Sequence, residues 1–176
     1  MTRGSSLPPV GRAAPAADPA PGKSVLDVAC GTGIVARVAK AHLGSNAHVV
    51  GVDVSPNMLT VAAAVDPGVE WRQGTADALP VAEGESFDIV VCQQGLQFFS
   101  DRLAAVREIR RVLTPAGRLA AAVWTSLENN PFLLTLHRVA EREIGPITDR
   151  RHGFGDGAAL QRLLEDAGLG TSAWRR

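Results

Sequence analysis

The sequence predicts an α/β fold built around a doubly wound, mostly parallel sheet, and three observations support this prediction. From Ser24 onward, short apolar runs alternate with segments of helical periodicity, which is typical of repeated βαβ units. Some of these runs, such as residues 47–53, are apolar on both faces, as buried parallel strands are. The chain has 176 residues, enough for one domain with a sizeable core.

Each element has its own signal in the chain. Apolar runs predict five strands, at residues 24–29, 47–53, 68–72, 86–92 and 118–124. Capping residues, glycines and prolines bound the helices, with Thr32, Ser55, Asn130 and Asp156 as the expected N-caps. The helices are expected to run to about Gly44, Val65, Glu143 and Gly168, and a further helix is expected from Asp101 to Leu113.

The charge balance and the cysteine count exclude several classes of function. The 18 basic and 18 acidic side chains give a formal net charge of zero, which argues against general nucleic-acid binding. No apolar run reaches about 18 residues, so we expect no membrane span. Two cysteines, Cys30 and Cys92, cannot form a disulfide-dense secreted framework. These observations favour a cytoplasmic protein that acts on a small molecule.

The first 22 residues differ in composition from the rest of the chain. They hold five Pro, five Ala and three Gly, and they lack the apolar core of a signal peptide. Such a segment cannot bury enough apolar surface to offset its ordering entropy. We therefore expect residues 1–22 to form a disordered arm ahead of a folded domain at residues 23–176.

A glycine-rich turn follows the first expected strand. Gly31 and Gly33 lie where that strand meets a helix, and residues without a Cβ let the backbone turn sharply and approach a ligand. Free N–H groups and the helix dipole at this turn would favour a ligand anion. Twenty residues after Gly33, Asp53 ends the second strand, where a carboxylate can accept both hydroxyls of a ribose. The alternative is that the glycines only shape a tight turn and that Asp53 caps the next helix.

Two classes of nucleoside ligand fit this constellation. Gly31, Gly33 and Ala36 match the glycine pattern of NAD-binding turns. Asp27, four residues before Gly31, lies close to the expected position of the ligand's charged group. A carboxylate there would repel an anionic pyrophosphate but would tolerate a ligand that carries an ammonium and a sulfonium group. The sequence therefore favours S-adenosylmethionine over NAD.

Five ordered blocks of the chain resemble the class I S-adenosylmethionine-dependent methyltransferases, in particular the small-molecule group that includes quinone and sterol methylases. The blocks are residues 25–33 (VLDVACGTG), 51–59 (GVDVSPNML), 74–80, 86–91 and 108–118, and a looser likeness continues to Gly168. The resemblance implies a Rossmann-like, three-layer α/β/α fold with a cofactor half at residues 23–125 and acceptor-side helices at residues 126–176. It also implies a chain truncated at both ends, with incomplete C-terminal edge strands that begin at about residue 170.

The resemblance implies roles for individual residues. Asp27 and the glycine loop would hold the methionine end of the cofactor, and Asp53 would hold the ribose hydroxyls. Asn57, Met58 and Ala76 would lie beside the adenine, and Cys92 and Gln93 near the transferable methyl group. The chain departs from the family pattern at Thr75, where an acid is usual, and at Ala29 and Ala116, where glycines are usual. The expected cofactor-binding residues are Asp27, Ala29, Cys30, Gly31, Gly33, Asp53, Val54, Asn57, Met58, Thr75, Ala76, Asp77, Cys92 and Gln93.

Catalytic residues are less constrained by the pattern. Methyl transfer needs alignment and a dry site, and it needs a general base only if the acceptor must lose a proton. His137 and His152 are candidates for such a base, with surface or packing roles as the alternative. No His/Cys spacing predicts a metal site. Side chains after the fourth strand could orient an acceptor, or simply begin and pack a helix: Gln93, Gln94, Gln97, Phe98 and Phe99.

The expected function is therefore the transfer of a methyl group from S-adenosylmethionine to a small organic acceptor, at carbon or oxygen. Two other functions stay open. One is a non-catalytic S-adenosylmethionine-binding fragment or regulatory module. The other is an NAD-dependent oxidoreductase. This function is less favoured, because the chain has no tyrosine for a Tyr/Lys catalytic pair. An uncovered parallel edge would favour pairing of two chains, so a homodimer is also expected.

Overall fold

The structure is a computed structural model that describes residues 22–170, and its centre is a five-stranded parallel sheet. The strand order is β3-β2-β1-β4-β5, and every neighbouring pair is parallel. This confirms the doubly wound α/β prediction. The strands are β1 (Val25–Val28), β2 (Val49–Asp53), β3 (Glu70–Gln73), β4 (Phe87–Gln93) and β5 (Leu113–Ala122).

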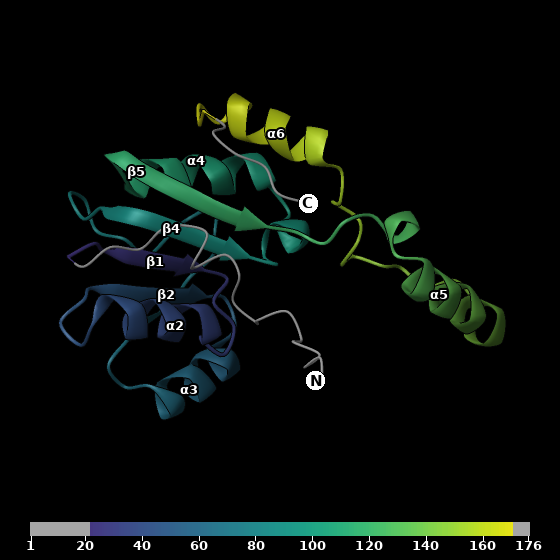
Figure 1. Cartoon of the computed structure of the whole chain (residues 1–176), viewed down its shortest axis with the longest axis horizontal. Helices are drawn as coiled ribbons and strands as arrows, with labels where there is room; N and C mark the ends of the chain where they lie inside the picture. Colours follow the sequence, from purple (N-terminus) through teal and green to yellow (C-terminus); the bar gives the residue numbers. More distant parts are fainter. Residues whose placement is uncertain (1–21, 171–176) are drawn as a thin grey trace, which may run out of the picture.

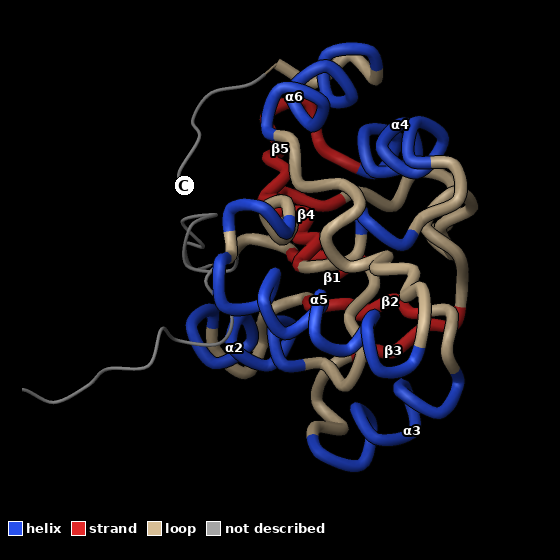
Figure 2. Tube along the Cα trace, turned by 90° about the vertical axis from the view of Figure 1, so that its right-hand side faces the viewer, coloured by secondary structure: helices blue, strands red, loops and turns tan. Residues whose placement is uncertain are grey.

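Helices cover both faces of this sheet. α2 (Ile34–Leu43) packs against one face, and α4 (Arg102–Val112) and α6 (Gly157–Asp166) pack against the other. Figure 2 shows α2 and α4 on opposite sides of the row of strands, which gives the expected three layers. α3 (Pro56–Val65) follows β2 and packs against β2 and β3. The remaining helical segments are η1 (Leu96–Phe98), η2 (Leu127–Asn129) and α5 (Pro131–Ile144).

The direction of the chain reverses at the middle of the sheet. From β1 the chain moves outward through β2 to β3, and it then returns to place β4 and β5 on the other side of β1. The strands are parallel, so their carboxyl ends share one edge, toward which the arrowheads point in Figure 1. Doubly wound folds bind ligands at this edge, where the strand order reverses. α5 projects beyond the same edge, and none of its residues is buried.

Most helix caps lie where the sequence predicts them. Ser55, Asp101 and Asp156 each accept a backbone N–H with their side chains at the starts of α3, α4 and α6. The prediction of Thr32 as the cap of the first helix was wrong. Gly33 occupies the N-cap position of α2, with a left-handed φ of 80° that a glycine adopts without steric cost.

The predicted start of the fifth strand, at residue 118, was also wrong. β5 begins at Leu113, directly after α4, and Leu113 pairs with Phe87 of β4. The register then shifts before Arg118 pairs with Ile89. Pro115 lies in this irregular stretch, which explains why a proline is tolerated inside the strand.

Two expectations fall wholly or mostly outside the described residues. The arm at residues 1–22 is described only at its last residue, and the incomplete strand expected from residue 170 falls on residues 171–176. None of the helices between residues 22 and 170 has the length and hydropathy needed to cross a membrane.

An aromatic side chain fixes the backbone around the glycine loop. The indole of Trp71, on β3, lies over Gly51 of the neighbouring β2. A Cβ added at Gly51 would come within 2.4 Å of that ring, and one at Gly33 within 2.2 Å. The indole Nε1 donates a hydrogen bond to the carbonyl oxygen of Asp66 at 3.0 Å, which holds the ring in place. The two glycines therefore make room for one tryptophan as well as for the turn.

We predict that Gly51→Ala destabilises the fold by about 1–3 kcal/mol, because the added methyl group overpacks a filled site. In a Trp71→Leu background the same substitution should cost less than half as much. The measurement is a double-mutant cycle of urea unfolding that includes Trp71→Leu alone. An equal cost in both backgrounds would show that the indole does not constrain Gly51.

A buried carboxyl group lies between β1 and α2. Asp27 is 1% exposed, and its Oδ2 accepts the backbone N–H of Ala36 in the first turn of α2 at 3.0 Å. Burial raises the pKa of Asp27 to about 7, the Ala36 hydrogen bond lowers it in part, and the nearby charge of Asp53 raises it further. The folded chain therefore holds a proton on Asp27 at pH values where an unfolded aspartate has lost it.

This raised pKa predicts a stability that falls as the pH rises. Between about pH 4 and pH 7 the folded state binds one proton more than the unfolded state, so the free energy of unfolding decreases with pH. The shift from 3.8 to about 7 corresponds to up to about 4 kcal/mol. Asp27→Asn keeps an acceptor for the Ala36 N–H and removes the titration.

The measurement is urea unfolding of the wild type and Asp27→Asn from pH 4 to pH 8. We expect the stability difference, wild type minus variant, to decrease steadily across this range. A difference that stays constant with pH would contradict a protonated Asp27.

Candidate cofactor site

A hollow opens at the carboxyl edge of the sheet. It is formed by the ends of β1 and β2, by the segment after β3, and by the segment between η1 and α4. Its position coincides with the reversal of strand order between β1 and β4. The lining residues are Val28, Ala29, Val52, Asp53, Val54, Gly74, Thr75, Ala76, Asp77, Phe98, Phe99, Ser100, Asp101 and Ala105.

Asp53, the last residue of β2, has a carboxylate that the backbone holds in a fixed orientation. Its Oδ2 accepts the N–H of Gly31 at 2.8 Å, and its Oδ1 accepts the N–H of Ser55 at 2.9 Å. An ionised carboxylate offers about four acceptor positions, so about two remain for a ligand. The hydroxyl of Ser55, and not Asp53, caps α3. The alternative in which Asp53 serves as the helix cap is therefore wrong.

The turn between β1 and α2 is strongly curved. Ala29, Gly31 and Gly33 all have left-handed backbone angles, with φ of 59°, 56° and 80°. The Gly33 N–H donates to the carbonyl oxygen of Cys30 at 2.9 Å, and the Gly31 N–H donates to Asp53. Both glycine N–H groups are therefore bonded within the protein.

The charge of the hollow is negative. Asp53, Asp77 and Asp101 line it, and among the described lining residues none is Lys, Arg or His. Asp27 lies close enough to Asp53 for the two charges to interact. A concave, partly apolar site of one sign concentrates ligands of the opposite sign. This lining therefore favours a cationic ligand and disfavours a pyrophosphate.

The structure brings some of the predicted cofactor residues together and leaves others apart. Ala29, Asp53, Val54, Thr75, Ala76 and Asp77 line the hollow. Asn57 and Met58 are exposed in the first turn of α3, and Gln93 is half-buried at the end of β4. These three do not line the hollow, nor do Asp27, Cys30, Gly31, Gly33 and Cys92.

The two cysteines are buried and unreactive. Burial, with the nearby charge of Asp27, raises the pKa of Cys92 to about 12. Burial is also the main cause that raises the pKa of Cys30, with Asp27 and Asp53 adding to it. A thiol that stays protonated is a poor nucleophile. Both cysteines therefore act as small core side chains.

Sequence reasoning missed part of the wall of the hollow. The sequence left Phe98 and Phe99 open between a wall for the acceptor and the packing of a helix, and the structure places them beside the residues that follow β2 and β3. Asp101 was expected only as the start of a helix, and it lines the hollow as well as capping α4 with its side chain. A signal was available for Asp101, because an acidic N-cap that closely follows a parallel strand lies near the carboxyl edge.

Comparison with known proteins agrees with this geometry. A family model described as "Methyltransferase domain" matches residues 26–121, more than half of the chain. The demethylmenaquinone methyltransferase of Lactococcus lactis is 41% identical over 103 residues, covering 56% of this chain and 40% of that protein. The ubiquinone biosynthesis O-methyltransferase of Hahella chejuensis is 37% identical over 115 residues, covering 63% of this chain and 46% of that protein.

A solved structure adds the cofactor to this likeness. The amino pentose methyltransferase CalS10 of Micromonospora echinaspora, solved with S-adenosylmethionine bound, is 31% identical with a TM-score of 0.56. The match covers 66% of this chain and 51% of that one. The chain spans less than half the length of the two curated relatives above. The matched residues hold all five strands except the first residue of β1 and the last residue of β5, and the chain belongs to the S-adenosylmethionine-dependent methyltransferase domain family.

Proposed function

We propose that the protein transfers a methyl group from S-adenosylmethionine to a small organic acceptor, at carbon or oxygen. The observation that carries this proposal is the acidic hollow around Asp53, which suits a nucleoside with a cationic tail. NAD fits less well, because its pyrophosphate would face Asp53, Asp77 and Asp101 without a basic partner among the described lining residues.

The lining residues and the neighbouring turn after β1 suit the parts of S-adenosylmethionine in a simple order. Asp53 has acceptor positions left for the two ribose hydroxyls. Thr75, Ala76 and Asp77 follow β3 and offer one polar and one apolar surface to the adenine. The turn of Ala29, Gly31 and Gly33, with Asp27 beneath it, would receive the cationic methionine end.

When bound, S-adenosylmethionine supplies an electrophilic methyl group whose leaving group is a neutral thioether. The protein's contribution is to position the reactants and to keep water out, and positioning alone can supply about 7–11 kcal/mol in favourable cases. Phe98, Phe99 and Val54 give the hollow an apolar wall that suits this role. A methyl transfer of this kind needs no metal ion and no redox step.

The acceptor is proposed to bind beyond the carboxyl edge. The names of the relatives favour a quinone-type acceptor, whose reduced quinol form is an apolar ring that carries hydroxyl groups. We propose that residues 23–125 form the cofactor half and that residues 126–176 cover the acceptor, because η2, α5 and the segment before α6 follow the end of β5. The proposal includes a cytoplasmic location and a homodimer formed through an edge of the sheet.

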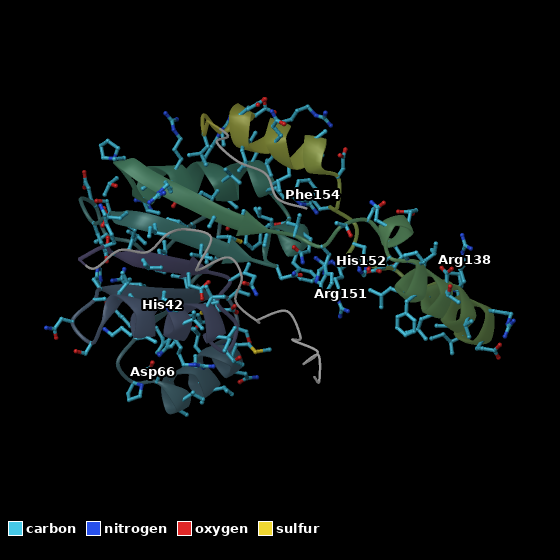
Figure 3. All side chains as sticks on the ribbon, in the orientation of Figure 1. His42, Asp66, Arg138, Arg151, His152 and Phe154 are labelled. Carbon is cyan, nitrogen blue, oxygen red and sulfur yellow. The ribbon has the colours of Figure 1, made fainter. Side chains whose placement is uncertain are left out.

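We predict that S-adenosylmethionine binds in isothermal titration calorimetry and that NADH gives no heat of binding. Asp53→Ala should weaken S-adenosylmethionine binding about 10- to 100-fold, because hydrogen bonds to a charged group contribute about 1.5–3 kcal/mol. Asp66→Ala is the matched control. Asp66 also accepts a backbone N–H two residues on, at 2.9 Å, but it lies far from the carboxyl edge (Figure 3).

The outcomes separate the three functions. A heat of binding with NADH and none with S-adenosylmethionine would favour the oxidoreductase. Equal loss of affinity in Asp53→Ala and Asp66→Ala would place the cofactor outside the hollow. Binding of S-adenosylmethionine without turnover on a panel of quinols, phenols and sterols would favour the non-catalytic binding module.

A further inference from the structure

A buried histidine and an aspartate form a pair outside the cofactor hollow. His152 is 9% exposed, and its Nδ1 lies 2.5 Å from Oδ2 of Asp149. The backbone N–H groups of Arg151 and His152 also donate to Asp149, through its Oδ1 at 2.9 and 3.3 Å. An ionised carboxylate can only accept, so Nδ1 carries the proton of this hydrogen bond. The Nε2 atom of His152 is then left with a free lone pair.

The loop that holds this pair is anchored to the carboxyl edge of the sheet. Arg150 donates to the carbonyl oxygen of Phe98 at 3.3 Å, and Phe98 lines the cofactor hollow. Arg102 donates to the carbonyl oxygens of Leu96 and Gln97, and its guanidinium lies 4.5 Å from the ring centroid of Phe154. Figure 3 shows His152 and Phe154 at the end of the sheet toward which the strands point.

Contacts with the segment after β5 hold the other side of the loop. The ring of His152 lies 5.8 Å from that of Trp124, measured between centroids, and the indole is 38% exposed. Gly155 lies against the backbone of Thr125 and Ser126, where an added Cβ would come within 2.1 Å of Ser126 N. The histidine is therefore fixed between the segments that follow β4 and β5.

Two buried polar atoms at this edge have no hydrogen-bond partner within residues 22–170. They are Nε2 of His152 and Oε1 of Gln97, whose residues are 9% and 3% exposed. The amide nitrogen of Gln97 is already directed to Oε1 of Gln94 at 3.4 Å. Buried polar atoms without partners are rare, and each of these two acceptors lacks a donor such as a hydroxyl group. A protic methyl acceptor would supply it.

Two carboxyl groups near His152 have lowered pKa values. Burial raises the pKa of Asp149, but the hydrogen bonds from His152 and from the backbone outweigh this effect and lower it overall. The pKa of Glu128, in η2, is also lowered. The largest cause is the hydrogen bond from its own backbone N–H, followed by the hydrogen bond from Ser126 and the charge of His152. The carboxylates of Asp149 and Glu128, on two different segments, thus stay ionised near His152.

We infer that His152 is the general base for acceptors that must lose a hydroxyl proton, with Asp149 as its positioning residue. The inference rests on the proposed methyltransferase function. The O–H bond of a phenol or enol breaks and its proton passes to Nε2, while the oxygen's electron pair forms the bond to the methyl carbon. The bond between that carbon and sulfur breaks with its electron pair on sulfur. The imidazolium then returns its proton to water.

His137, the other candidate base, is arranged differently. It lies in α5, where its Nε2 is 3.3 Å from Oε1 of Glu141 within the same helix. That helix projects away from the sheet, as Figure 1 shows. The structure thus separates two histidines that the sequence leaves equivalent, and His137 provides a matched control.

The test uses 4-nitrocatechol, whose phenolate absorbs at longer wavelength than the neutral phenol. The dye is titrated into the full chain with and without S-adenosylhomocysteine, at a pH below the ionisation of the free dye. No methyl transfer occurs, so the readout is independent of activity. We expect wild type and His137→Gln to show the phenolate band, His152→Gln to lose it, and Asp149→Asn to weaken it.

Turnover on phenolic acceptors should fall about 10²- to 10⁴-fold in kcat for His152→Gln, the range typical of a lost general base, with KM for S-adenosylmethionine unchanged. Thermal unfolding shows whether each variant is folded. If His152→Gln does not fold, Asp149→Asn still tests the inference. An equal band in wild type and His152→Gln, or no band in either, would overturn the inference. Failure of S-adenosylmethionine to bind in calorimetry would instead overturn the proposed function.

Discussion

The hydrogen bond from the Gly31 N–H to Asp53 is the interaction on which the site depends. It joins the turn after β1 to the end of β2, so it fixes the relative position of two strand ends that share the sheet edge. Gly31 can make it because a φ of 56° is open to glycine at little cost. The adjoining backbone is set by Trp71, which fills the space that Gly33 and Gly51 leave. One turn, one acid and one indole therefore fix the ends of β1 and β2 relative to each other.

The same arrangement gathers negative charge where the strands end. Asp27, Asp53, Asp77 and Asp101 come from four different segments and meet at one edge only because the sheet is parallel. The fold relieves part of this repulsion by keeping Asp27 buried and protonated up to about pH 7. A cationic ligand would relieve more of it, because its charge offsets the acids that the backbone holds together. Ligand binding and the protonation of Asp27 are thus expected to be linked.

Much of the fold and the centre of the site could be predicted from the sequence. The spacing of Gly31, Gly33 and Asp53 marks a strand, a turn and a second strand end, and the structure places Asp53 beside Gly31. Ser55 and Asp156 act as caps because capping depends on local backbone geometry alone. Thr32 failed as a cap because the left-handed turn moves the start of the helix to Gly33.

The rest depends on contacts between distant parts of the chain. Phe98 lies in a segment without periodicity, so its place in the wall of the hollow could not be predicted from the local sequence. The pairing of His152 with Asp149 is local, but its place near Trp124 and Phe98 follows from packing across more than 25 residues. β5 begins earlier than predicted because Leu113 pairs with Phe87 on β4. No feature of residues 113–117 predicts this pairing.

A crystal structure of the full chain with S-adenosylhomocysteine would test most directly whether the acid at the end of β2 holds the nucleoside. We predict that both ribose hydroxyls lie within hydrogen-bond distance of the Asp53 carboxylate, with the bond from the Gly31 N–H retained. A nucleoside bound elsewhere, or one whose hydroxyls do not contact Asp53, would contradict this role of the acid.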